Sequence, residues 1–181
     1  NFFRPFFSGI FLENQLQTSS RMFEFVYKMF GEGHATLPKS GIEAIPKQLL
    51  ENLKTTKFKY NTKVETLKET EIILTNGTCI ESDYTIIASE ASELVPNLNS
   101  QSINWKSCVT LYFETETRVI NKQLIGLISK PGSLVNNIFY NSSLKTRSKP
   151  ASELLSVTVI DTQSLSHEAL VVAVKEELLS Y

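Results

Sequence analysis

The first half of the chain reads NFFRPFFSGIFL (residues 1–12), RMFEFVYKMF (21–30), LPKSGIEAIPKQLL (37–50), NTKVETL (61–67) and TIIAS (85–89), in that order. In the second segment, apolar side chains recur every three or four positions, which is typical of a helix with one buried face. We expect that face to contain Met22, Phe25, Val26 and Met29. Thr18 or Ser19 is suited to cap its start. Gly31 or Gly33 is suited to end it.

The spacing of apolar residues changes from helical to strand-like after a second predicted helix, which contains Pro46. Pro46 suits the first turn of a helix, where its missing N–H costs little. Beyond it, Phe58 and Tyr60 alternate with lysines. The pair Asn76-Gly77 lies between strand-like runs and predicts a hairpin, because both turn positions tolerate positive φ. Tyr84–Ala88 is predicted to be a short buried strand, so that residues 58–88 would form a small sheet.

The second half of the chain predicts an antiparallel sheet. Residues 97–104 are mostly polar and indicate a connector. Strand-like runs then follow at 107–113, 123–128, 135–140 and 154–160, separated by Pro, Gly, Asn and Ser. Because no helical pattern interrupts them, antiparallel pairing is favoured over parallel pairing. A closing helix is expected from Ser164 to about Leu179, with a face made of Leu165, Ala169, Val172, Ala173 and Leu179.

Composition excludes several classes of function. The chain has 181 residues, 41% of them hydrophobic, with 18 basic and 19 acidic side chains. This balance gives no general attraction to nucleic acid. No apolar run is long enough to span a bilayer and no signal peptide is visible, so we expect a cytoplasmic protein. The cysteines, Cys79 and Cys108, and the histidines, His34 and His167, fit no metal-ligand pattern, so no metal site is expected.

The usual cofactor and catalytic motifs are also missing. The nearest match to a dinucleotide-binding loop is Gly31-Glu32-Gly33, but Thr36 replaces the third glycine and the segment follows a helix instead of a strand. No P-loop and no nucleophile elbow is present. Catalytic residues therefore stay unknown from local motifs alone.

A longer similarity supplies what the short motifs do not. The stretch FFRPFFSGIFLENQLQTSSRMFEFVYKMFGEGHATLPKSGIEAIPKQL resembles the FAD-dependent amine oxidase and phytoene desaturase-like flavoproteins. The resemblance implies an α+β fold with a largely antiparallel substrate-domain sheet, packed helices and a small β segment of a split FAD-binding domain. It implies the helical start of a substrate domain at 1–40, a segment of the FAD-binding domain at 41–98, and the substrate-domain sheet with its closing helix at 99–181.

The same resemblance implies roles for particular residues. Val64 would meet the FAD adenine through its backbone, although a buried strand valine is the plain structural alternative. Ala88 and Ser89 would lie where the chain passes near the cofactor. Arg4, Phe7 and Phe11 are candidates for substrate binding, against a structural role for Arg4 and core packing for the phenylalanines.

The implied parent is an FAD-dependent oxidoreductase that oxidises a C–N or C–C bond of a small hydrophobic or amine substrate by hydride transfer to flavin. The family's G-x-G-x-x-G segment and its C-terminal glycine-rich segment are not found in these 181 residues. We therefore expect the chain to be a central, mainly substrate-binding fragment that is inactive and flavin-free by itself. Bare apolar faces would make it self-associate. The alternative is a non-catalytic binding module that keeps the substrate-domain fold.

Overall fold

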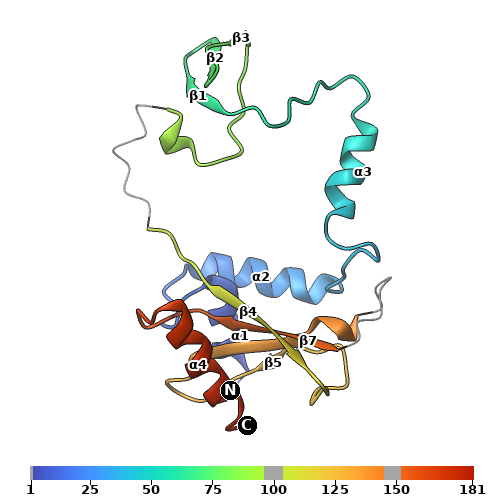
Figure 1. The fold of residues 1–181 in the computed structure, drawn as a ribbon, viewed down its shortest axis with the longest axis vertical. Helices are drawn as coiled ribbons and strands as arrows, with labels where there is room; N and C mark the ends of the chain where they lie inside the picture. Colours follow the sequence, from blue (N-terminus) through green and yellow to red (C-terminus); the bar gives the residue numbers. More distant parts are fainter. Residues whose placement is uncertain (1, 96–103, 145–151) are drawn as a thin grey trace. The chain divides into compact units, whose positions relative to one another are not determined.

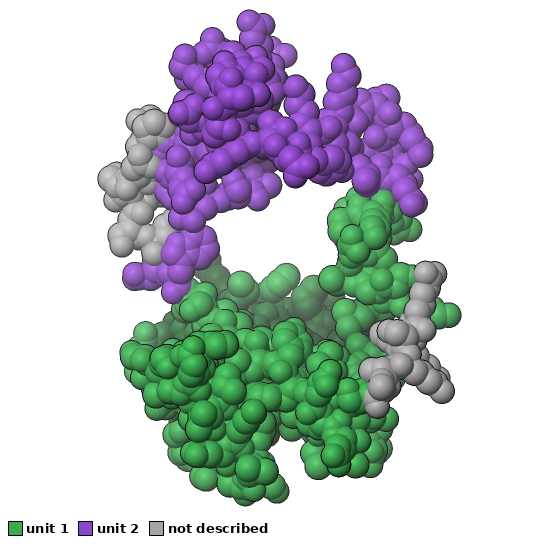
Figure 2. Space-filling model, viewed as in Figure 1, with its two compact units in different colours: residues 1–49, 106–181 green, residues 50–105 purple. Residues whose placement is uncertain are grey.

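The computed structural model of the protein describes residues 2–95, 104–144 and 152–181. The chain divides into two compact units, one made of Asn1–Leu49 and Lys106–Tyr181 and the other of Leu50–Trp105 (Figure 2). We call them unit 1 and unit 2 and treat each by itself. Most of the expected connector at 97–104 lies outside the described residues.

Unit 1 is built on an antiparallel sheet of four strands (Figure 1). They are β4 (Val109–Thr115), β5 (Gly126–Leu127), β6 (Val135–Tyr140) and β7 (Glu153–Val159), in the spatial order β4-β7-β6-β5. All three pairings are antiparallel, with Leu111 opposite Val157 and Val157 opposite Ile138. The four expected strands are confirmed, although β5 is shorter than predicted.

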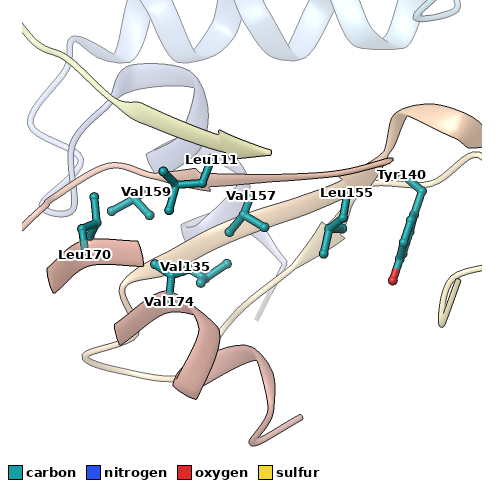
Figure 3. Packing of buried hydrophobic residues seen from close by; sticks show 8 residues of the cluster. All are labelled: Leu111, Val135, Tyr140, Leu155, Val157, Val159, Leu170 and Val174. Carbon is teal, nitrogen blue, oxygen red and sulfur yellow. The ribbon is translucent and has the colours of Figure 1, made fainter. Parts of the chain in front are cut away.

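Helix α4 (His167–Leu178) covers one face of this sheet and closes the core. Ser166 caps its first turn, since the Ser166 hydroxyl accepts a hydrogen bond from the Ala169 N–H at 3.3 Å. Figure 3 shows Leu170 and Val174 pointing at the sheet residues; the fully enclosed side chains are Leu170, Val135, Val157, Val159 and Val174.

The closing helix is confirmed, but its predicted face is wrong. Val172 and Leu179 are exposed, and Leu170 and Val174 are buried instead. Residues 169–174 form an unbroken apolar run, so the sequence pattern does not mark one face. Packing against the sheet decides which side of α4 is buried, because Leu170 and Val174 fit against β6 and β7.

The N-terminal region forms two helices, α1 (Phe3–Phe11) and α2 (Ser20–Glu32). Most of the aromatic start, residues 1–12, forms α1. Ser19 caps α2 through a hydrogen bond from the Arg21 N–H, and Gly33 ends it, as predicted. Helix α1 contacts β6, and Asn136 of β6 binds the Pro5 carbonyl of α1.

The predicted buried face of α2 is also wrong. Met22, Phe25 and Met29 are exposed and Val26 is half-buried; Phe23 and Phe30 are exposed as well, although they contact the phenylalanines of α1. Helix α2 carries large apolar side chains on several sides. The side that contacts α1 is the one with Phe23 and Phe30. Helix α3 (Ala44–Asn52) follows, with Pro46 in its first turn as expected.

Unit 2 contains a second antiparallel sheet in the order β1-β2-β3. Its strands are β1 (Val64–Leu67), β2 (Glu71–Leu74) and β3 (Cys79–Glu81). The predicted hairpin is confirmed: Gly77 has a φ of +80°, and the Asn76 side chain accepts a hydrogen bond from the Thr78 N–H at 3.0 Å. With the sheet of unit 1, this establishes the expected α+β class.

Two strand predictions in unit 2 are wrong. Phe58 and Tyr60 precede β1 and belong to no strand, and Tyr84–Ala88 is unpaired chain before the 3-10 turn η1 (Ala91–Glu93). Tyr84 is 92% exposed and Ile86 93% exposed. A strand needs a hydrogen-bonded neighbour, and the sheet of unit 2 ends at β3. In the part of the chain that the structure describes, no helix is long and apolar enough to cross a membrane.

Candidate functional site: a polar cavity beside the first helix

A cavity of about 330 Å³ opens within unit 1, beside the first half of α1. Arg4, Pro5 and Ser8 line it from α1, and Asn14 lines it from the loop after that helix. The turn at 128–136, which joins β5 to β6, supplies a second wall. Ile160, Asp161 and Gln163, which follow β7, complete the lining. The cavity thus lies where three segments distant in sequence converge.

The 128–136 wall is held in place by the closing helix. Glu177 of α4 accepts hydrogen bonds from the Leu134 N–H at 2.8 Å and the Val135 N–H at 3.4 Å. The Ser133 hydroxyl also bonds to its carboxylate. Gly132, with a φ of +79°, makes the turn at a backbone conformation that a side chain would strain. One carboxylate therefore holds three consecutive residues of the cavity wall.

The α1 wall is fixed by a close approach to β6. The Asn136 side chain, only 9% exposed, donates to the Pro5 carbonyl at 3.0 Å. A Cβ at Gly9 would lie 2.6 Å from the Asn136 Oδ1, so only glycine allows the helix to come this near. Ser8, which is 3% exposed, is held against the cavity by the same packing.

Three ionisable side chains line the cavity, and two of them are cationic. The Arg4 Nη2 lies 3.4 Å from the Asn14 carbonyl oxygen. The Lys130 ammonium lies 5.9 Å from the centre of the Tyr181 ring. The Asp161 Oδ1 accepts a hydrogen bond from the Gln163 N–H at 2.9 Å. The lining therefore carries one more positive than negative charge.

The other two predicted substrate-binding residues belong to an aromatic cluster between α1 and α2. Phe7 is 3% exposed, and its ring lies 4.7 Å from Phe23 and 5.5 Å from Phe11, between ring centres. Phe6 meets Phe30 at 5.3 Å. Phe11 is half-buried at the edge of the cluster. Of the three candidates, only Arg4 lines the cavity.

The predicted cofactor-contacting residues all lie in unit 2. Val64 begins the edge strand β1, opposite Leu74, and the pairing is irregular between Val64 and Thr66. Ala88 and Ser89 are exposed and follow the unpaired Tyr84–Ala88 segment. Among these described residues, Val64 is in a sheet and the other two are in irregular chain.

A second polar network ties the loop after α1 to the start of the second half of unit 1. Lys106 forms an ion pair with Glu13 and donates to the Thr18 hydroxyl at 3.1 Å. The Thr18 N–H donates to the Glu13 carboxylate at 2.6 Å. The Lys106 hydrogen bond, followed by the bonds from Thr18, lowers the pKa of Glu13 to about 2.

The sequence arguments missed Lys130, Asp161, Asn136 and Glu177. The Pro131-Gly132 pair marked the turn, which was the one available signal for that wall. Nothing local indicated that Glu177, more than forty positions away, would hold it, because that contact depends on how α4 lies on the sheet.

The α+β fold and the ligand-sized cavity agree with what sequence comparison finds. The chain belongs to the flavin-containing amine oxidoreductase family, whose model matches residues 1–180. The expected kinship with the FAD-dependent amine oxidases is thereby confirmed, and it implies a flavin in the parent enzyme. No curated protein and no solved structure matches the chain significantly.

The segment Gly31–Gly33, which is the nearest sequence match to a dinucleotide loop, does not fit the pyrophosphate of a flavin dinucleotide. Gly31 and Gly33 lie at the C-terminal end of α2, where unpaired carbonyls and the negative end of the helix dipole would repel a phosphate. A phosphate site needs the opposite end of a helix. We therefore assign Gly31 and Gly33 no role in holding a flavin.

Proposed function

We propose that this chain supplies the substrate-binding part of an FAD-dependent oxidoreductase, together with a segment of its flavin-binding domain. The parent would oxidise a C–N or C–C bond and pass the electron pair to its flavin. The match of the amine oxidoreductase family to residues 1–180 carries the proposal. Because the N-terminal stretch resembles phytoene desaturase-like proteins as well as amine oxidases, we propose that the oxidised bond is either a C–C or a C–N bond.

We assign substrate binding to unit 1 for a physical reason. Its sheet and helices form a rigid frame around a ligand-sized cavity that contains charged, hydroxyl and apolar groups. In this assignment Arg4 contacts the substrate. Phe7 and Phe11 do not line the cavity; Phe7 holds α1 against α2 by contacting Phe23, and Phe11 packs against Phe7.

We assign unit 2 to the flavin-binding domain, with Val64, Ala88 and Ser89 nearest the cofactor. As an edge strand, β1 keeps part of its backbone free of pairing within its sheet, and a backbone contact from Val64 to an adenine needs such freedom. The unpaired segment with Tyr84 and Ile86 would join the main sheet of that domain. Its exposed apolar side chains would then be covered.

We further propose that the isolated chain self-associates and that the parent works in the cytoplasm. Large apolar side chains are exposed on α2 and α3, including Phe25, Met29 and Leu49. Surfaces of this kind favour association in water. Light scattering at about 100 µM protein would test the first point, and a monomer would contradict it.

The central test compares the 181-residue chain with the same chain expressed together with the coding sequence that flanks it in its gene. We expect the 181-residue chain to be colourless after purification, because its Gly31–Gly33 segment does not fit a pyrophosphate. The longer protein should be yellow and should reduce its flavin when given a hydrophobic amine or polyene. A longer protein that binds no FAD would contradict the proposal and favour a non-catalytic binding module.

A narrower test addresses Val64. In the flavin-containing protein, Val64→Ala should bind FAD almost normally, whereas Val64→Pro removes a backbone N–H and should weaken binding about tenfold or more. Equal affinities of the two variants would show that the Val64 backbone does not meet the cofactor.

A further inference from the structure

We propose that the cavity beside α1 binds a small organic carboxylate, with Arg4 and Lys130 meeting its charged end. The inference rests on the function proposed above, because it concerns the cavity assigned there to the substrate. It adds that the ligand, whichever of its bonds is oxidised, carries a carboxylate end. Binding would be a property of unit 1 and would need no flavin, so a failure to bind the carboxylate can be told apart from a failure of the longer protein to bind or reduce FAD. The proposal rests on four observations, namely the charge of the lining, the unused hydrogen-bonding capacity, the apolar part of the wall and the contacts that hold the walls.

The charge of the lining favours an anion. Arg4 and Lys130 line the cavity, and neither forms an ion pair with a residue that the structure describes. Asp161 is the opposing charge, but one of its oxygens is occupied by the Gln163 N–H. An anionic ligand would give both cations the partner that they lack.

The lining also offers hydrogen bonds that the protein does not use. Arg4 uses a single N–H in its contact with Asn14, so most of its five donors stay available. Ser8, which is 3% exposed, places a hydroxyl group beside the same cavity. A carboxylate can accept several bonds at once, which matches this surplus of donors.

The apolar part of the wall indicates the body of the ligand. Pro5, Ile128 and Leu134 line the same cavity as the cations. Inorganic phosphate would leave these side chains uncovered, whereas the hydrocarbon part of an organic acid would cover them. A volume of about 330 Å³ is at the small end for ligand sites and suits a short chain or a single ring.

Contacts within the protein hold both walls of the cavity. Glu177 holds one wall through three hydrogen bonds, and the contact of Asn136 with Pro5 and Gly9 holds the other. A ligand entering such a cavity orders few protein groups, so less of its interaction energy is lost.

The test titrates the 181-residue protein with three probes by isothermal calorimetry and two-dimensional NMR. Hexanoate should bind with a dissociation constant on the order of 1 mM, which is ordinary for a ligand of its size. Hexylamine has the same chain with the opposite charge, and phosphate has the charge without the chain. Both should bind about tenfold more weakly or not at all. Tighter binding of hexylamine, or equal binding of phosphate, would overturn the proposal.

Variants locate the site. Arg4→Gln and Lys130→Gln should each weaken hexanoate binding about tenfold, because each removes a charge-assisted contact. Asp161→Asn should strengthen it by about twofold to fivefold, since a repulsive charge is lost. Lys122→Gln, an exposed lysine of unit 1 outside the cavity, is the control and should change nothing. Melting curves check that each variant folds.

If Arg4→Gln proves unstable, Lys130→Gln and Asp161→Asn still decide the matter, because their expected effects have opposite signs. Hexanoate binding that responds to neither variant, or that falls equally in Lys122→Gln, would show that the anion binds elsewhere.

Discussion

Unit 1 and unit 2 each contain an antiparallel sheet, yet they bury very different amounts of apolar surface. In unit 1 the strands and α4 enclose a continuous core: Leu111, Val135, Tyr140, Leu155, Val157, Val159, Leu170 and Val174. Among the described residues of unit 2, Leu74 alone is a buried hydrophobic side chain. The difference does not come from strand pairing, since the strands of both sheets pair antiparallel and each sheet has one irregularity.

What separates the units is the presence of a covering layer. A sheet is stable when a helix or a second sheet covers its apolar face, and α4 does this in unit 1. The sheet of unit 2 has three short strands, and no described helix is packed on it to the same extent. A sheet this small is marginal by itself. The comparison predicts that unit 1 carries most of the stability of the chain.

The largest expected effect is in the core of unit 1. Leu170→Ala should lower the free energy of unfolding by about 2–5 kcal/mol, because Leu170 is 2% exposed and its loss leaves a cavity against the sheet. Val172→Ala, on the exposed side of the same helix, should cost less than about 0.5 kcal/mol. Urea denaturation followed by circular dichroism measures both.

The same truncation in unit 2 tests whether the two units unfold independently. Leu74→Ala should leave the main transition of unit 1 where it is, since Leu74 belongs to unit 2. If Leu74→Ala destabilises the main transition as much as Leu170→Ala does, the two units unfold together and the contrast drawn here is wrong.

Hydrogen exchange should show the contrast without any substitution. The amide of Val157, in the interior strand β7, should exchange at least about 100-fold more slowly than that of Ile72 in β2, a difference of about 2.7 kcal/mol in opening free energy. NMR or mass spectrometry of the native protein measures both rates. Equal protection would mean that unit 2 is as stable as unit 1.

A smaller effect is expected where α4 holds the cavity wall. Glu177→Ala removes the acceptor of the Leu134 and Val135 N–H groups, and we expect it to cost about 1–3 kcal/mol. Glu176→Ala, an exposed neighbour on the same helix, is the matched control. Chemical shifts of residues 130–134 should move in the first variant only. Unchanged shifts there would show that the wall does not depend on this carboxylate.

Local chemistry predicted much of the fold. The Asn76-Gly77 turn, the Ser19 cap and the four strands of unit 1 each follow from short patterns in which one conformation is strongly preferred. The faces of α2 and α4 did not follow, because both helices carry apolar residues on more than one side. Their burial depends on α1 and on the sheet, which are distant in sequence.

The candidate site was predictable only in part. The family resemblance pointed to the first helix, and Arg4 does line the cavity there. Lys130 and Asp161 reach the same cavity through the turn after β5 and the end of β7, and no spacing rule connects these positions. The strand predicted at Tyr84–Ala88 failed for a related reason, since no strand among the described residues of unit 2 pairs with it.

The smallest effect concerns pH and belongs to unit 1 alone. Ionised Glu13 is stabilised by Lys106 and Thr18, so its pKa falls from 4.5 to about 2 on folding. A carboxyl whose pKa is lowered on folding stabilises the protein when ionised, and that contribution is lost as the pH falls from about 4.5 to about 2. The stability of unit 1 should therefore decline across this window, as acid titrations at several urea concentrations would show.

In Glu13→Gln the decline should be shallower, whereas Glu24→Gln, an exposed glutamate of α2, should keep the original slope. Lys106→Gln should flatten the curve in part, because the hydrogen bonds from Thr18 to Glu13 remain, and the double variant should behave as Glu13→Gln does. A slope that is the same in all of these variants would mean that the ion pair contributes no measurable stability, which is common for pairs with an exposed partner.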